Sequence, residues 1–511
     1  MPHHPPEIGR SHRLIGAVAL LLVVLALIGN VAAFAWMRPY GILRPFAPLA
    51  EAREEIHSKF VGEIDDQALL DAALKGMADA LGDKNTEYLS AKELAYFNEH
   101  VGGAFTGIGA EIDIHNDRLR IIAPLDDSPA WNAGVLPGDI VLEIDGQDTL
   151  GIDIIDAMGK LKGEAGTDVT IKVRHLDGAI QTLTITRAKI EVASVRGYRR
   201  DPGNGFKYMI DPDNKIAYVK LTQFGDQSYN EMQDVLTRLK GQGMRALILD
   251  LRDNGGGLLD AAVAISDLFL TQGKTIVSTE GRAEPRATAT STRETLLPDT
   301  PLVVLINQNS ASASEIVAGA IRDNDRGLLI GTRSFGKGSV QQLIPLGDGS
   351  SALKLTTAYW YIPSGKLIHR KDDAKDWGVD PSPDSFVPMD DEQFRAMLMR
   401  RRAIEADDPY AKRQGPITPA WLKENLLDDQ LAAALDAAQQ RLTEGGWPKV
   451  GVGKDIALAE PSEEDQLAQR KQELQEMIEQ IDEQLRQLAQ DADEAGEIEE
   501  EAALPQPVGR P

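Results

Sequence analysis

Residues 309–315 read NSASASE, and residues 334–341 read SFGKGSVQ. In the first stretch, serines and small residues lead into the apolar run at 316–321, a pattern typical of the start of a helix. Ser312 and Glu315 have the S-x-x-E spacing of a capping box, in which the serine side chain accepts a backbone N–H. Taken alone, the first stretch favours a serine that only caps a helix, because capping serines are common.

The second stretch places Lys337 between two glycines, ahead of the apolar run at 340–346. A lysine in this setting can approach backbone closely and lose solvent, and burial lowers the pKa of a lysine. Lowering it from about 10.4 to about 7 disfavours the charged amine by roughly 4.6 kcal/mol, which a desolvated site can supply. A neutral lysine can take the proton of a serine hydroxyl, so the two stretches together indicate a nucleophile, Ser312, and its base, Lys337.

Gln341 is the third polar residue of this group. A strand from Val340 onward puts Lys337, Ser339 and Gln341 on one face, because side chains alternate along a strand. This placement predicts that Gln341 holds the lysine amine by a hydrogen bond.

The same glycines also fit a nucleotide-binding P-loop up to its last position. Residues 331–337 read GTRSFGK, but Gly338 stands where a P-loop has the hydroxyl that binds magnesium. The following residues have the pattern of a strand, whereas a P-loop leads into a helix. We therefore reject nucleotide binding.

The sequences SASASE at 310–315 and FGKG at 335–338, together with Gln341, resemble the carboxyl-terminal processing peptidases, also called tail-specific proteases. In that family the nucleophile is the middle serine of SASASE, and the lysine follows 25 residues later, as Lys337 follows Ser312 here. The resemblance implies Ser312 as nucleophile, Lys337 as general base and Gln341 as the residue that orients the lysine. It also implies that no metal or organic cofactor is required.

The resemblance extends to the stabilisation of charge. Residues 249–257 read LDLRDNGGG, which resembles the family's L-D-L-R-x-N-x-G-G motif. Three glycines before a helix are often only a tight turn, but they also expose N–H groups at the positive end of a helix dipole. The resemblance implies an oxyanion hole made by the N–H of Gly257, with Gly256 as the alternative, and by that of Ala313. Asp323, eleven residues after Ser312, matches an acidic position important in some members.

Residues 100–190 show short alternating strands separated by glycines. The order of GIGAEI at 107–112, SPAWNAGVLPGDIV at 128–141 and IDG at 144–146 resembles a PDZ domain of the bacterial type, and a plain β-rich module is the alternative. A PDZ domain adds the end of a peptide as an extra strand and holds its carboxylate on N–H groups of a glycine loop. By resemblance, that substrate-binding loop consists of Gly107, Ile108 and Gly109.

The peptidase core is predicted at 200–385. Buried strands are expected at 216–221, 246–251, 301–306 and 353–362. A helix at 229–240 joins the first two into a βαβ unit, and another is expected through 261–270.

Three further segments are expected from the pattern of apolar residues. Residues 50–99 have helical periodicity and resemble the family's N-terminal helical region, which often helps to dimerise, so we expect a homo-oligomer. Residues 386–457 are predicted to be an insertion followed by closing helices, with a helix over 426–442. Residues 458–511 are expected to be an acidic coiled-coil or disordered tail. A solvated single helix is the alternative to the coiled coil, and residues 497–511 have a composition typical of disorder.

The expected fold class is therefore α+β multidomain. It comprises the N-terminal helical region, the PDZ domain, a ClpP/crotonase-like α/β catalytic core, implied by the resemblance, and the C-terminal helical or coiled-coil tail.

Composition excludes several classes of function. The formal net charge of −25 argues against nucleic-acid binding. The absence of cysteine excludes thiol catalysis, disulfides and cysteine-based zinc sites. Residues 14–37 are almost wholly apolar, which suits one membrane span or a long secretory signal within 1–37, and we favour the uncleaved anchor. The expected location is the bacterial periplasm, with one N-terminal helix in the inner membrane.

The sequence thus predicts a serine endopeptidase that recognises the C-terminal tails of exported proteins. In Gram-negative relatives a lipoprotein can act as adaptor. A non-catalytic or adaptor-gated tail-binding scaffold at the membrane is one alternative, and a Ser-His-Asp hydrolase on another fold is a second.

Overall fold

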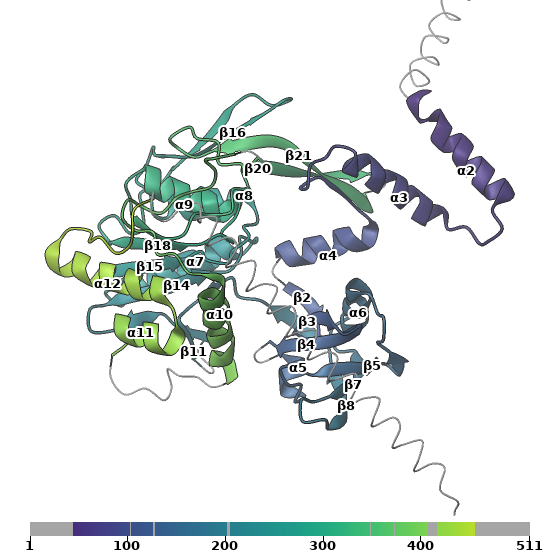
Figure 1. The fold of residues 1–511 in the computed structure, drawn as a ribbon, viewed down its shortest axis with the longest axis horizontal. Helices are drawn as coiled ribbons and strands as arrows, with labels where there is room; N and C mark the ends of the chain where they lie inside the picture. The colour runs from purple at the N-terminus through teal and green to yellow at the C-terminus, as the bar shows by residue number, and fades with distance from the viewer. Residues whose placement is uncertain are drawn as a thin grey trace, which may run out of the picture. The chain divides into compact units, whose positions relative to one another are not determined.

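The computed structural model describes residues 44–454, apart from 103, 126–127, 202–204, 348, 372–373 and 407–415 (Figure 1). The described residues divide into two compact units, with the boundary between Gly82 and Asp83. The predicted anchor at 1–37 and the predicted tail at 458–511 lie outside the described residues. Within the described ranges, no helix combines the length and the apolar character needed to cross a membrane.

The first unit is a pair of helices preceded by one short turn. It contains η1 (Arg44–Phe46), α2 (Ala47–Lys59) and α3 (Asp66–Asp79). Asp65 caps α3, because its side chain accepts the N–H groups of Gln67 and Ala68. Arg53 of α2 donates two hydrogen bonds to the Asp66 carboxylate, which holds the two helices together.

The second unit begins with β1 (Glu87–Leu89) and α4 (Ala91–Gly102), which lead into the predicted PDZ domain. The helical pattern at 50–99 agrees with α2, α3 and α4, but it does not reveal β1. The main PDZ sheet has the order β3 (Ala110–His115), β4 (Arg118–Pro124), β5 (Ile140–Ile144), β7 (Asp168–Arg174) and β8 (Ile180–Thr186), and β6 (Gln147–Asp148) pairs with β5. A separate ladder joins β2 (Ala104–Gly107) to β9 (Ala188–Glu191), and the helices are α5 (Pro129–Asn132) and α6 (Ile154–Leu161).

The centre of the peptidase core is a mostly parallel sheet. Its order is β10 (Val195–Arg196), β14 (Ile216–Leu221), β15 (Ala246–Asp250), β18 (Leu302–Ile306) and β19 (Leu328–Gly331), and β13 (Met209–Asp211) also pairs with β14. The helix α7 (Ser228–Gly241) connects the parallel strands β14 and β15, which confirms the predicted βαβ unit.

Both faces of this sheet are buried, as is usual for parallel strands. On β14, Ala217 and Val219 face one apolar cluster, which also contains residues of α7, α8 (Leu259–Asp267) and α9 (Ala313–Asp323). Ile216 and Tyr218 face a second cluster, formed with α11 (Pro419–Leu426) and α12 (Asp429–Glu444). The chain beyond 386 therefore supplies one complete covering layer of the core (Figure 1).

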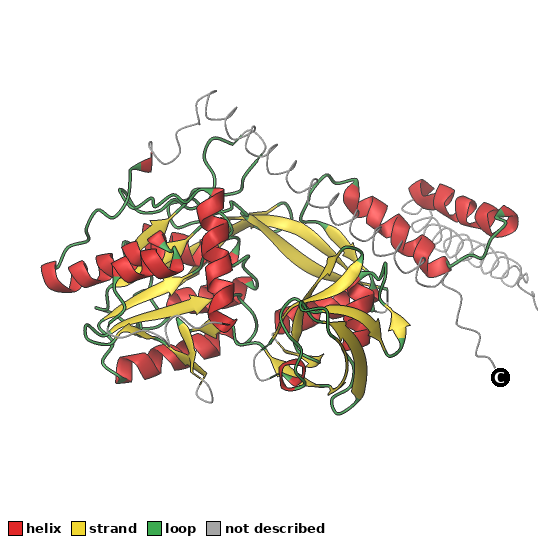
Figure 2. Cartoon of the chain, turned by 60° about the horizontal axis from the view of Figure 1, so that its bottom comes forward, coloured by secondary structure: helices red, strands yellow, loops and turns green. Residues whose placement is uncertain are grey.

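A second sheet, antiparallel throughout, contains the strands after Lys337; Figure 2 draws all strands in yellow. Its order is β1, β21 (Ser351–Tyr361), β16 (Thr275–Gly281) and β17 (Ala287–Thr290), and β20 (Ser339–Leu346) pairs with β21. A small ladder of β11 (Arg199–Asp201) and β12 (Gly205–Lys207) is separate. The strand predicted at 353–362 is present, but the prediction that it is buried was wrong. β21 is mostly half-buried, because it carries polar residues such as Lys354 and Thr356 along a hairpin outside the parallel sheet.

The predicted single helix at 426–442 is interrupted in the structure. Leu427 ends α11 with φ +55°, in the left-handed region, and the Asp428 side chain caps α12 by accepting the N–H of Leu431. The break lets the chain turn between two helices that both pack on the sheet. Before them lies α10 (Asp391–Ala406).

A buried ion cluster links these closing helices to the end of β15. Arg252 is fully buried and donates hydrogen bonds to Asp250 and Asp428 at 2.7 Å each. Arg401 of α10 donates to the same Asp428 carboxylate at 2.7 Å. Burial alone would raise the pKa of Asp428, but the neighbouring Arg252 and Arg401 hold it well below its usual value. The cluster therefore depends on opposite charges from distant parts of the chain.

Replacement of Asp428 by alanine is expected to lower the free energy of unfolding by about 3–5 kcal/mol, because Arg252 is then buried with one carboxylate instead of two. The measurement is the urea midpoint of unfolding. Asp429→Ala is the matched control, because Asp429 is the next residue and pairs with Lys423 only at the surface. It should cost less than about 1 kcal/mol. Equal shifts in the two variants would contradict the stabilising role of the cluster.

Candidate active site

Ser312 lies in a strained turn between β18 and α9. Its backbone has φ +56° and ψ −115°, a region that costs a residue with a side chain roughly 1–3 kcal/mol. The turn is held from outside: the Ser310 hydroxyl donates to the carbonyl of Leu251 at 2.9 Å, and the Ala311 N–H donates to the carbonyl of Asn254 at 3.0 Å. The half-buried Ser312 is thus fixed beside the loop that follows β15.

The glycine loop packs directly against this turn. A Cβ built on Gly256 would lie 2.8 Å from the Cβ of Ser312 and 2.9 Å from the nitrogen of Ala313, so only glycine fits there. The Gly256 N–H already donates to the Asn254 side chain at 2.9 Å. In contrast, no described residue accepts the N–H of Gly257 or that of Ala313. This geometry favours Gly257 over Gly256 as the second donor to an oxyanion.

Lys337 lies half-buried in the loop before β20. Burial, followed by the positive charge of Lys354, lowers its pKa below that of an ordinary lysine, although the carboxylates of Glu87 and Asp83 act in the opposite direction. The part of the chain that the structure describes offers the amine neither a hydrogen bond nor an ion pair, and none joins it to the Ser312 hydroxyl.

Glu315 joins the serine turn to the lysine loop. Its Oε2 accepts the N–H of Ser312 and the N–H of Lys337, both at 2.8 Å. Burial raises the pKa of Glu315 to about 7, although its hydrogen bonds act in the opposite direction. The capping-box spacing correctly predicts the bond from Ser312 to Glu315. The bond to Lys337 is not visible in the sequence, because it depends on how two distant segments meet.

Gln341 does not contact the lysine amine in this structure. Its side-chain nitrogen donates to the hydroxyls of Ser339 at 2.9 Å and Thr356 at 3.1 Å. The side-chain contact between Ser339 and Gln341 agrees with the prediction that they share a face. The predicted hydrogen bond from Gln341 to Lys337 is absent, and the Gln341 amide is bonded instead to these two hydroxyls.

Asp323 is placed at the far end of α9 from Ser312. The helix has 11 residues, so its two ends are separated by about 16 Å. The Asp323 carboxylate accepts hydrogen bonds from Arg322 at 2.8 Å and from the N–H of Ser364 at 3.0 Å. The structure therefore does not bring Asp323 to the proposed nucleophile, and its contacts are those of a residue that anchors a loop.

Two described histidines bear on the Ser-His-Asp alternative. His175 bonds to Asp139 at 2.7 Å, but both belong to the PDZ domain. His369 lies beside the lysine loop, because a Cβ built on Gly338 would come within 2.8 Å of its backbone nitrogen. Burial lowers the pKa of His369, and its buried Nδ1 finds no partner among the described residues. Neither histidine is bonded to Ser312.

The predicted carboxylate loop, Gly107 to Gly109, lies between β2 and β3. The carbonyls of Ile108 and Gly109 accept the N–H groups of Ala130 and Leu125, and Gly109 has φ +75°. No acceptor for the Gly109 N–H lies within the described residues. The loop is thus fixed by its carbonyls, which leaves this N–H for a ligand.

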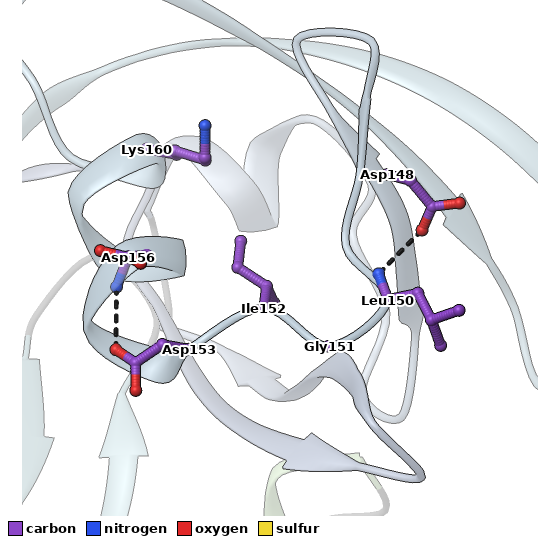
Figure 3. Close-up of a pocket in the computed structure, with 7 residues that line it drawn as sticks. All are labelled: Asp148, Leu150, Gly151, Ile152, Asp153, Asp156 and Lys160. Carbon is purple, nitrogen blue, oxygen red and sulfur yellow. Dashed lines mark hydrogen bonds between the residues drawn. The ribbon is translucent and has the colours of Figure 1, made fainter. Parts of the chain in front are cut away.

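A cavity of about 630 Å³ lies elsewhere in the PDZ domain (Figure 3). It is lined by Asp148, Leu150, Gly151, Ile152, Asp153, Asp156 and Lys160. Asp148 accepts the N–H of Leu150, and Asp153 accepts that of Asp156, so these two carboxylates shape a turn and cap α6 (Figure 3). The cavity includes none of the predicted site residues.

Known proteins are similar to this chain over both domains. Residues 215–382 match the model of peptidase family S41, and residues 120–175 match that of the PDZ domain. The carboxy-terminal-processing protease of Bartonella bacilliformis is 36% identical over 351 residues, which cover 67% of this chain and 75% of the relative. The carboxy-terminal processing protease CtpA of Bacillus subtilis is 32% identical over 343 residues, with coverages of 67% and 69%.

Among solved structures, the photosystem II D1 C-terminal processing protease is 29% identical and gives a TM-score of 0.39, over 66% of this chain and 86% of that one. The two bacterial relatives carry the assignment, because each is more than 30% identical and is covered over more than two thirds of its length. The chain therefore belongs to the carboxy-terminal processing proteases of peptidase family S41 and is a serine peptidase with a PDZ domain.

Proposed function

We propose that this peptidase works by a Ser–Lys mechanism and selects exported proteins by their C-terminal tails. The observation that carries the proposal is the environment of Ser312. It sits in a strained turn beside two N–H groups without acceptors among the described residues, and it shares a hydrogen-bond acceptor with the lysine loop. Such a turn presents a nucleophile to a ready oxyanion site.

In the proposed mechanism, neutral Lys337 takes the proton of Ser312 while the hydroxyl oxygen attacks a peptide carbonyl. The N–H groups of Gly257 and Ala313 stabilise the resulting oxyanion. The C–N bond then breaks, and the lysine gives its proton to the leaving amine. Water, activated by Lys337 in the same way, hydrolyses the acyl-enzyme and restores the serine. Substrate binding must bring the hydroxyl and the amine closer, since no hydrogen bond joins them in this structure.

The PDZ domain supplies the selection of substrates in this proposal. The Gly109 N–H is available to bind the carboxylate of a tail, and the neighbouring strand β3 can pair with its backbone. We place the enzyme in the bacterial periplasm, anchored through residues 14–37, because that stretch is long and apolar. A homo-oligomer and a lipoprotein adaptor complete the proposal, and both follow from the family resemblance of the sequence.

The test uses three versions of one unfolded protein that differ only in their C-terminal tails. Cleavage is measured in the presence of a chelator. The apolar tail with a free carboxylate should be cleaved best. Amidation of the tail, or two added aspartates, should raise KM by about 10-fold while kcat stays the same, because only binding is lost. Equal KM values for the three tails would contradict tail recognition. Binding of the apolar tail without cleavage would favour the adaptor-gated alternative.

A further inference from the structure

Glu315 is bonded to both halves of the proposed site. Its side chain is fully buried, and its two oxygens accept four hydrogen bonds. Oε2 accepts the N–H groups of Ser312 and Lys337, each at 2.8 Å. Oε1 accepts the N–H of Gly336 at 2.6 Å and the hydroxyl of Ser334 at 2.5 Å. One carboxylate therefore binds the backbone of the nucleophile, the backbone of the base and two residues just before the base.

The four donors suit an ionised carboxylate, and their hydrogen bonds oppose the burial that raises the pKa of Glu315 to about 7. Three of them are N–H groups, which can only donate. The Ser334 oxygen accepts the N–H of Val379 at 2.7 Å, which directs its own proton toward Glu315. A glutamine has the same size, but its NH2 group replaces one of the two acceptor oxygens and turns N–H groups toward two of the four donors. It fills the space and removes the acceptor of those two bonds.

The two bonds to Oε2 limit the separation of the serine and the lysine. Because both end on one atom, the backbone nitrogens of Ser312 and Lys337 cannot be further apart than twice 2.8 Å. The N–H of Phe335 also donates to the carbonyl of Ser310 at 3.0 Å, but this link lies outside the pair. The bond from Ser312 additionally helps to hold its unfavourable φ of +56°.

We propose that Glu315 is a positioning residue, whose Oε2 sets the spacing between the backbone of the nucleophile and that of the base. The proposal rests on the Ser–Lys mechanism and adds to it a residue that touches neither the substrate nor the reacting atoms. Proton transfer needs this spacing, whereas substrate binding does not. Loss of the carboxylate therefore lowers kcat and leaves KM nearly unchanged.

The test compares Glu315→Gln with Glu231→Gln. Glu231 is a matched control, because it also lies in the first turn of a helix, and its Oε2 accepts two N–H groups and a hydroxyl, from Ser194 and Val195. Glu315→Gln should lower kcat by about 100-fold, with KM within about 3-fold, and should slow fluorophosphonate labelling of Ser312 by a similar factor. Glu231→Gln should keep each of these quantities within about 3-fold.

Unchanged labelling in folded Glu315→Gln would overturn the proposal, and so would equal losses in the two variants. If Glu315→Gln does not fold, residue-resolved hydrogen exchange of the wild type tests the proposal instead. The N–H groups of Ser312 and Lys337 should be protected, whereas that of Gly257 should exchange quickly, and rapid exchange at Ser312 or Lys337 would refute the proposal. Failure of the Ser–Lys mechanism is distinguishable, because the wild type would then not be labelled at Ser312, or Lys337→Ala would be labelled as fast as the wild type.

Discussion

Replacement of Ser312 by alanine is expected to lower kcat for peptide hydrolysis by at least about 10⁴-fold, since the nucleophile is removed and only the oxyanion site and binding remain. The fold should survive. Alanine keeps the Cβ that packs against Gly256 and the N–H that bonds to Glu315. The measurement is single-turnover cleavage of an unfolded protein, with the circular dichroism spectrum and the unfolding midpoint as checks.

The matched control for Ser312→Ala is Ser314→Ala, two residues along the same helix start. The Ser314 hydroxyl is buried and donates to the carbonyl of Asn254 at 2.9 Å, so its removal should cost about 1 kcal/mol of stability. It should lower kcat far less than Ser312→Ala does. A Ser312→Ala protein that still cleaves at the wild-type rate would contradict the proposed mechanism.

Replacement of Lys337 by alanine is expected to lower kcat by about 10³-fold or more, because the serine loses its base. The pH dependence of wild-type activity provides a second test of Lys337 as the base. Lys337 acts as a base only when neutral. At pH values below its pKa kcat/KM should therefore be low, and it should rise as the pH increases through that pKa. Burial and the charge of Lys354 lower that pKa, which moves the rise to lower pH than for an ordinary lysine. The variant should lack this rise.

Two charge changes near the lysine should move the rise in opposite directions. Lys354→Gln removes a positive neighbour, so the pKa of Lys337 increases and the rise moves to higher pH. Glu87→Gln removes a negative neighbour, so the rise moves to lower pH. These partners form an ion pair at 2.6 Å, so the unfolding midpoints should be measured as well. A rise at the same pH in both variants would show that another group controls it.

Local patterns predict the core well because they act over short distances. The apolar run at 216–221 matches β14, and the helical pattern at 229–240 lies within α7 (Ser228–Gly241). The capping-box spacing correctly predicts the bond between Ser312 and Glu315. In each case, neighbouring residues determine the structure, either by their alternation or by a cap three residues away.

The remaining features depend on contacts between distant segments. One partner of Gln341, Thr356, comes from β21, and one partner of Arg252 is Asp428, which lies 176 residues further along the chain. Residues 386–425 have no recognisable motif and are predicted to be an insertion, yet α11, at the end of this segment, covers one face of the central sheet together with α12, which agrees with the predicted closing helix. Apolar periodicity shows that a helix has a buried side, but it does not identify the surface that buries it.

The ion cluster at Arg252 has a consequence for the order of folding. Arg252 precedes the glycine loop, while its partner Asp428 starts the last described helix and is therefore synthesised late. Until that helix has been made, the arginine cannot be neutralised by Asp428, and one face of the central sheet remains exposed. A nascent chain therefore cannot complete the catalytic core before its closing helices exist. This order delays proteolytic competence until nearly the whole polypeptide has been translated.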